Sequence, residues 1–132
     1  MNEFYKRMNV QNTGKTYIAD YILDNYNNRH TLVFDLGAGS CVIEQMLLDK
    51  NFKGSFVAIE KNKVETIRST YKHKIVKGDI LEKLKQHFFD IIKYDNIVIV
   101  MSAILHELDE AYLKRLSRYI EGITWFDKNV TL

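Results

Sequence analysis

The sequence predicts an α/β domain whose mainly parallel sheet of about five strands is covered by helices on both faces. Short apolar runs alternate along the chain with longer amphipathic segments, the pattern typical of repeated β-α units. The segment 96–101 (NIVIVM) is continuously apolar, as expected of a central parallel strand that helices cover on both sides. Together these observations indicate three layers, with the sheet in the middle.

Length and composition indicate one domain. The 132 residues fit a single domain, 1–132, with an N-terminal arm over 1–12 and a core over 13–127. Hydrophobic residues make up 46%, enough for a core, and the net charge of +2 does not indicate nucleic acid as a partner. The single cysteine, Cys41, excludes an internal disulfide and fits a cytoplasmic location. No apolar run is long enough to serve as a secretory signal or to span a membrane.

The first half of the chain predicts a helix followed by two β-strands with a helix between them. Apolar residues recur at helical spacing over 13–27, which predicts the first helix. The β-rich run 31–36 (TLVFDL) predicts the first strand, which ends at a glycine. A helix over 42–49 follows, with Ser40 as its expected N-cap. The segment 55–60 (SFVAIE) is the second predicted strand.

The second half continues the same alternation. A helix is predicted over 62–71, and a short third strand over 74–77 ends at a Gly-Asp pair. A long helical stretch is expected over 80–94. After the apolar fourth strand, apolar residues on one face predict a helix over 107–119. The segment 122–126 (GITWF) is the expected fifth strand.

Residues just after the strands are the candidates for a ligand site, because ligands of open α/β sheets bind at the carboxyl ends of the strands. The first such turn contains Gly37 and Gly39, which permit positive φ and close approach of a ligand to the backbone. The helix that follows offers free N–H groups that suit a carboxylate or a phosphate. Such a turn also occurs without any ligand, so the pattern by itself leaves both interpretations open.

An acidic residue at the end of the second strand makes the ligand interpretation stronger. Glu60 lies 21 residues after Gly39, where a carboxylate can accept both hydroxyls of a ribose. The alternative is a solvated surface glutamate. A dinucleotide site needs a third glycine for close packing, and Val42 stands at that position. Asp35, just before the turn, would repel a pyrophosphate and would suit a cationic amino group.

Four segments together resemble the ordered motifs of class I S-adenosylmethionine-dependent methyltransferases: VFDLGAGS, FVAIE, VKGDIL and DNIVIVMSAILHEL. The resemblance covers roughly Thr13 to Asp127. It implies a Rossmann-like, doubly wound fold, S-adenosyl-L-methionine as cofactor and S-adenosyl-L-homocysteine as product. The resemblance implies that Asp35, Gly37 and Gly39 hold the methionine part, that Glu60 binds the ribose hydroxyls, and that Asp79 and Ile80 lie at the adenine. The other expected cofactor-binding residues are Ala38, Lys61, Met101 and Ser102.

The chemistry of the cofactor agrees with this assignment. Its ammonium, ribose diol and adenine amine are all donors, and Asp35, Glu60 and Asp79 are acceptors at the ends of three strands. For Asp79 the alternative is a helix N-cap, and the two roles can coexist. The sequence departs from the family pattern at Cys41, where a third glycine is common. We expect the small cysteine to leave room for the cofactor, and we do not expect it to act as a nucleophile.

His106 is the candidate catalytic base, because it follows the fourth strand on the acceptor side and has a pKa suited to neutral pH. The alternative is a histidine that caps or packs at the start of the next helix. The four histidines show no ligand-like cluster, so no metal site is predicted. The chain has no proline, which excludes the proline-containing motifs of enzymes that methylate amino groups or cytosine C5. The segment MSAILHEL resembles the branch that acts on small molecules.

Two further function classes stay open. The chain is alternatively a non-catalytic methyltransferase-like module that binds a partner chain, or a fragment of a larger methyltransferase. A nucleotide- or NAD-binding domain is a third, weaker alternative. An expected fifth strand containing Trp125 would form an exposed apolar edge, which proteins normally cover. A homodimer or a completing chain at that edge would provide the cover.

Overall fold

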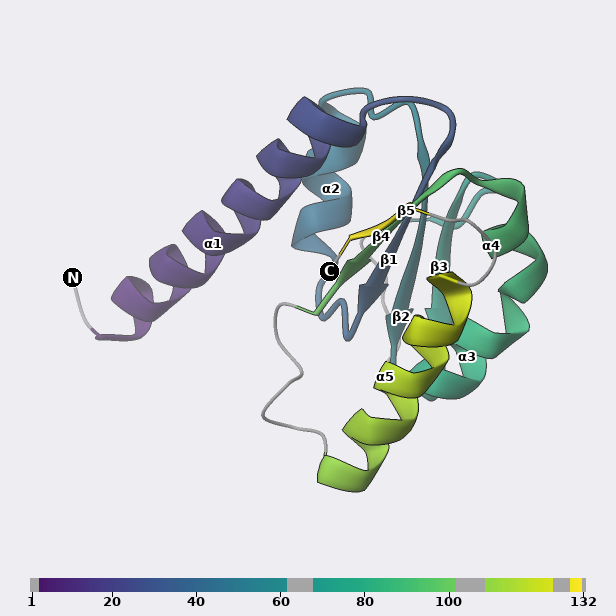
Figure 1. The fold of residues 1–132 in the computed structure, drawn as a ribbon. Helices are drawn as coiled ribbons and strands as arrows, with labels where there is room; N and C mark the ends of the chain where they lie inside the picture. The colour runs from purple at the N-terminus through teal and green to yellow at the C-terminus, as the bar shows by residue number, and fades with distance from the viewer. Residues whose placement is uncertain (1–2, 62–67, 102–108, 125–128, 132) are drawn as a thin grey trace.

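A computed structural model of the chain has a parallel sheet between two layers of helices (Figure 1). It describes residues 3–61, 68–101, 109–124 and 129–131. The strands are β1 Thr31–Leu36, β2 Ser55–Glu60, β3 His73–Lys77, β4 Asn96–Val100 and a short β5, Asn129–Thr131. The helices are α1 Glu3–Tyr26, α2 Val42–Asp49, α3 Ile80–Gln86, α4 Phe88–Lys93 and α5 Glu110–Thr124.

The strand order is β3-β2-β1-β4-β5, and every pair of neighbouring strands runs parallel. The chain therefore builds the sheet outward from β1 to β3, and then returns to place β4 on the other side of β1. The order reverses between β1 and β4, which is where ligands bind in open α/β sheets. The predicted α/β class with a parallel sheet covered on both faces is confirmed.

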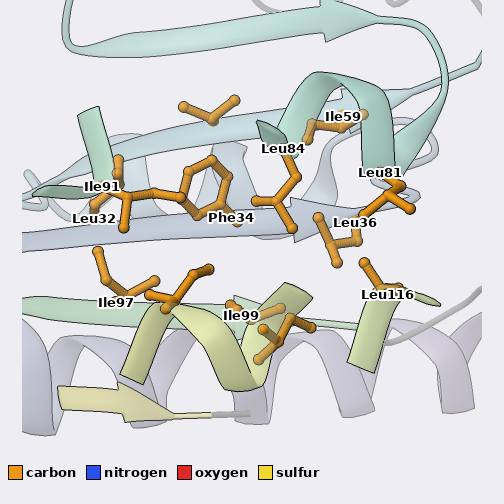
Figure 2. Close-up of a cluster of buried hydrophobic side chains, with 13 residues drawn as sticks. Leu32, Phe34, Leu36, Ile59, Leu81, Leu84, Ile91, Ile97, Ile99 and Leu116 are labelled. Atoms are coloured by element: carbon orange, nitrogen blue, oxygen red, sulfur yellow. The ribbon is translucent and has the colours of Figure 1, made fainter. Parts of the chain in front are cut away.

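Alternate residues of β1 face opposite helical layers, because side chains of a strand alternate in direction. Leu32, Phe34 and Leu36 join the buried cluster formed with α3, α4 and α5, which Figure 2 shows. Val33 joins the cluster formed with α1 and α2. Asp35 has the same parity as Val33, so its carboxyl points into the layer that contains α1 and α2. The direction of this one strand decides which helices surround the first candidate site residue.

Several predicted boundaries hold and others are corrected. The strands 31–36 and 55–60 and the helix 42–49 agree with the structure residue for residue. The first helix begins at Glu3, so most of the expected arm 1–12 is continuous with α1. The expected helix over 62–71 falls mostly outside the described residues, and 68–71 are not helical.

The N-cap of α2 is Cys41 and not Ser40, and the side chain of Cys41 makes no capping hydrogen bond. The expected long helix over 80–94 is two helices, α3 and α4, that meet at His87. His87 Nδ1 lies 2.7 Å from the carbonyl oxygen of Lys83, so its ring satisfies a carbonyl at the end of α3.

The fifth strand was predicted in the wrong place. Residues 122–124 form the last turn of α5, while Trp125 and Phe126 lie outside the described residues. Leu116, Ile120 and Ile123 are buried at helical spacing, and their packing outweighs the β-propensity of this segment. The sheet ends instead at β5, whose Val130 pairs with Ile97 of β4. A homodimer or completing chain at this edge stays a prediction.

Candidate functional site

The turn between β1 and α2 has an unusual backbone. Gly37, Gly39 and Cys41 all have positive φ, at 76°, 61° and 61°. The amides of Gly37 and Ala38 both donate to the carbonyl oxygen of Ile59, at 2.8 and 3.1 Å, so the turn begins as an extension of the pairing with β2. Two glycines accept this geometry without steric cost, whereas a cysteine in the left-handed region is strained by about 1–2 kcal/mol.

Cys41 occupies a backbone conformation that a glycine would favour. Its side chain is 0% exposed and packs with Ala38 and Ala58. Burial, followed by the nearby charge of Glu44, raises the pKa of the Cys41 thiol to about 12. At neutral pH this thiol is protonated and buried, so it is unsuited to act as a nucleophile.

Glu60 holds the turn from the neighbouring strand. Its Oε2 accepts a hydrogen bond of 2.6 Å from the amide of Gly39, and its Oε1 accepts one of 3.0 Å from the amide of Lys61. A carboxylate has about four lone-pair positions, so each oxygen keeps capacity for another donor. Glu60 is therefore fixed in orientation beside the turn and remains able to accept from a ligand.

Asp79 is the N-cap of α3, as one of the two interpretations expected. Its Oδ2 accepts from the amide of Glu82 at 3.0 Å. Its Oδ1 accepts from the hydroxyl of Tyr112 at 2.9 Å, and that hydroxyl accepts from the amide of Leu81 at 2.8 Å. Tyr112 thus ties α5 to the turn after β3. Burial, more than any other cause, raises the pKa of the Tyr112 hydroxyl, so it stays a donor at neutral pH.

Asp35 forms a buried pair with a residue that sequence reasoning missed. Asp35 is 1% exposed and Glu44, in the first turn of α2, is 0% exposed. Their carboxyls lie within hydrogen-bonding reach of each other. No other described residue donates a hydrogen bond to Asp35 Oδ1 or to either side-chain oxygen of Glu44, and the backbone amide of Glu44 acts on its own carboxyl. Burial, in both cases the largest cause, raises the pKa of Asp35 and raises that of Glu44 to about 10.

One cation acts on this pair. The ammonium of Lys15, on α1, lowers the pKa of both carboxyls, although no ion pair within 4 Å joins it to either. Lys15 and Glu60 are partly exposed, in contrast to the two buried carboxyls. The first candidate site residue therefore belongs to a cluster of ionisable groups from β1, β2, α1 and α2.

The remaining candidates lie at the same edge of the sheet or outside the described residues. Ile80 opens α3 next to Asp79, and Met101 follows β4; both pack partly buried against the cluster of Figure 2. Ser102 and His106 lie outside the described residues, so their predicted roles stay predictions. The amides of Gly78 and Gly39 both bond to Glu60, through its carbonyl and its carboxylate. Three neighbouring turns are thereby joined at this edge.

Other features of the described residues do not compete with this site. A cavity of about 20 Å³ lies near Leu32 and Ser55, where β1 and β2 begin, and therefore at the far edge of the sheet from the candidate site. It has room for little more than a water molecule. Within the described ranges, no group of three or more His, Cys, Asp or Glu is arranged to hold a metal ion. The described helices also include none that is both long and apolar enough to cross a membrane.

No protein-family model, curated protein or solved structure matches this chain.

Proposed function

We propose that this chain is a Rossmann-like, class I methyltransferase domain that binds S-adenosylmethionine across the carboxyl ends of β1, β2 and β3. One observation carries the proposal. Asp35, Glu60 and Asp79 stand at the carboxyl ends of three adjacent parallel strands, beside the point where the strand order reverses. S-adenosylmethionine presents three groups of donors along its length, so a row of acceptors with this spacing suits it.

The hydrogen-bonding state of the three carboxylates supports the fit. Asp35 Oδ1 is buried and accepts from no donor among the described residues, so it has capacity for an ammonium. Glu60 is already oriented by Gly39 and Lys61, which leaves lone pairs for the ribose hydroxyls. Asp79 is oriented by its capping bond and by Tyr112, and it would accept from the adenine amine. Groups held before binding lose less entropy when the ligand arrives.

The positive-φ turn would let the ligand lie against backbone. Among described residues, no atom lies within 4 Å of a Cβ built on Gly39, so the space above this glycine is open. Ile80 would pack against the adenine, and Met101 would lie next to the ligand from β4. When bound, S-adenosylmethionine supplies an electrophilic methyl group on a sulfonium, and the protein's part is to position an acceptor in line with it. A small-molecule acceptor and a cytoplasmic location remain our predictions.

Calorimetric titration with S-adenosylmethionine, S-adenosylhomocysteine and NAD tests the proposal. We expect the first two to bind and NAD not to bind. Asp79→Asn should lower the affinity for S-adenosylhomocysteine by at least about tenfold, because one hydrogen bond to a charged group is lost. Asp109→Asn is the matched control, since Asp109 also caps a helix by accepting from a backbone amide, that of Tyr112 at 2.7 Å.

The outcomes separate the alternatives. If Asp79→Asn and Asp109→Asn lower the affinity for S-adenosylhomocysteine equally, Asp79 does not bind the adenine. A folded wild-type chain that binds none of the three ligands would refute the cofactor proposal and favour the partner-binding module. Given binding, His106→Ala should lower turnover without lowering the affinity for S-adenosylhomocysteine, and a loss of affinity instead would contradict the role of His106 as a base.

A further inference from the structure

The contacts of the buried carboxyl pair, Asp35 and Glu44, reveal no role for this pair in stabilising the fold. Asp35 and Glu44 are almost fully buried and lie within hydrogen-bonding reach of each other. Three of their oxygens accept no hydrogen bond from another described residue, and the backbone amide of Glu44 acts on its own carboxyl. Two ionised carboxylates in this position would repel each other strongly and would each lack compensation for lost hydration. The pair satisfies itself only if one carboxyl keeps its proton and donates it to the other.

We propose that Asp35 and Glu44 share this proton in the ligand-free chain, and that they release it when the ammonium of an amino-acid-type ligand takes its place. The inference rests on the proposed function and extends it. It adds Glu44 to the ligand site, and it couples binding to proton release. The exchange balances: a pair of net charge −1 and a ligand ammonium become a pair of net charge −2 with its ammonium, and one proton passes to the solvent.

The charged surroundings favour an ammonium at this position. Lys15 from α1 acts on both carboxyls, and Glu60 from β2 acts on Asp35. The thiol of Cys41 in the turn lies in the same surroundings, since both carboxyls raise its pKa. Lys15 already stabilises the ionised form of both carboxyls from beyond ion-pair distance. A ligand ammonium closer to the pair would act in the same direction and more strongly, because charge interactions grow as distance and local dielectric fall.

Glu44 is not explained as an ordinary residue of its helix. It follows Ile43 and precedes Leu47 by three positions, so it lies on the buried face of α2 where an apolar side chain would pack. An acidic residue in the first turn normally interacts with the helix dipole from a solvated position. This carboxyl instead lies against that of Asp35, the second-last residue of β1. Its placement makes sense if the site needs a second negative charge once a cation arrives.

The test measures protons released on binding. S-adenosylhomocysteine is titrated at pH 7 in two buffers of different ionisation enthalpy, and its affinity is measured from pH 6 to 8. S-adenosylhomocysteine has the amino-acid ammonium but a neutral thioether in place of the sulfonium, so any protons released on binding are due to the amino-acid part. We expect release of about one proton, and an affinity that rises up to about tenfold per pH unit. Methylthioadenosine, which lacks the amino-acid part, should release none.

Glu44→Gln removes the shared proton while keeping the shape of the side chain. Its proton release should fall to zero and its affinity should no longer depend on pH. Asp49→Asn is the control on the same helix, because Asp49 is exposed and accepts from the Gln45 side chain at 2.9 Å, and it should behave as the wild type. If Glu44→Gln does not fold, the comparison between S-adenosylhomocysteine and methylthioadenosine on the wild-type chain still decides.

The outcomes distinguish this inference from the function on which it rests. Binding of S-adenosylhomocysteine without proton release, or release of the same number of protons by methylthioadenosine, overturns the proton-sharing pair and leaves the cofactor site intact. Absence of binding by both ligands overturns the proposed function, and this inference falls with it.

Discussion

Removing the hydroxyl of Tyr112 is the sharpest test of how the turn after β3 is held. This hydroxyl accepts from the amide of Leu81 at 2.8 Å and donates to Asp79 Oδ1 at 2.9 Å. Tyr112→Phe removes both hydrogen bonds and keeps the ring, which packs partly buried against the apolar cluster. The loss therefore isolates the polar contribution of one atom that joins α5 to the start of α3.

The expected loss of stability follows from the two bonds. A hydrogen bond to a charged group contributes about 1.5–3 kcal/mol and a neutral one about 0.5–1.5 kcal/mol. The lower ends apply here, because Asp79 is exposed to solvent. Tyr112→Phe should then lower the free energy of unfolding by about 2 kcal/mol. For a domain of this size, that corresponds to a fall in Tm of about 8 °C.

Tyr94→Phe is the matched control. The Tyr94 hydroxyl makes one neutral hydrogen bond, to Ser55 Oγ at 2.9 Å, so its removal should cost about 1 kcal/mol and lower Tm by about 4 °C. Thermal unfolding followed by circular dichroism measures both. A double-mutant cycle with Asp79→Asn should give a coupling energy of about 1 kcal/mol for the Tyr112–Asp79 pair. The reasoning is refuted if Tyr112→Phe destabilises no more than Tyr94→Phe.

Three further predictions concern packing, pH and thiol reactivity. Gly54→Ala should destabilise the fold by about 1–3 kcal/mol, because the added Cβ would lie 2.7 Å from a backbone carbonyl oxygen of β1 and 2.5 Å from an aromatic ring. Gly14→Ala, in open space on α1, should instead stabilise the fold by about 1 kcal/mol. Urea unfolding of both variants checks this, and a change of the same sign in the free energy of unfolding of both would contradict it. The pKa of Glu44 is raised to about 10, so the folded chain binds a proton at this carboxyl more tightly than the unfolded chain does. The stability that this group contributes is fully present below about pH 4.5 and falls as the pH rises toward 10, so the Tm of Glu44→Gln should rise relative to that of the wild type between pH 5 and 9. A Tm difference that stays constant over this range would argue against the pair. Cys41, fully buried with its thiol pKa raised to about 12, should resist Ellman's reagent in the native chain at pH 8 and react fully in guanidinium chloride, and rapid native labelling would show that the thiol is accessible.

Patterns of neighbouring residues were sufficient to predict two strands of the sheet and the helix that joins them. β1 and β2 were predicted with correct bounds because they are short, nearly continuous apolar runs, as expected of strands buried on both faces. α2 was predicted because its apolar residues recur at helical spacing. The candidate site residues at the ends of β1, β2 and β3 followed from the same strands, since parallel strands bring their carboxyl ends to one edge. Even the departure at Cys41 was visible as a glycine position, and the structure assigns it a positive φ.

Patterns of neighbouring residues failed where distant contacts decide. Ile123 and Thr124 are β-branched and favour strands, yet Ile123 is 2% exposed as part of α5, because the helix buries a continuous apolar face. The hydroxyl of Tyr112 finds its partner 33 positions away, and nothing in the local sequence indicates that contact. For Glu44 a signal existed, an acidic residue on the apolar face of a helix, but the sequence does not show what lies opposite.

The sequence by itself determined the class of the fold, the order of its β-α units and the edge of the sheet at which acidic residues gather, because all three follow from periodicity and from the direction of parallel strands. Only the tertiary structure decided that Asp35 is buried against Glu44, that Glu60 is held by Gly39 and that Asp79 is held by Tyr112. These contacts depend on how α1, α2 and α5 pack against the sheet. That packing is set by the summed burial of many side chains, which no single segment of the sequence contains.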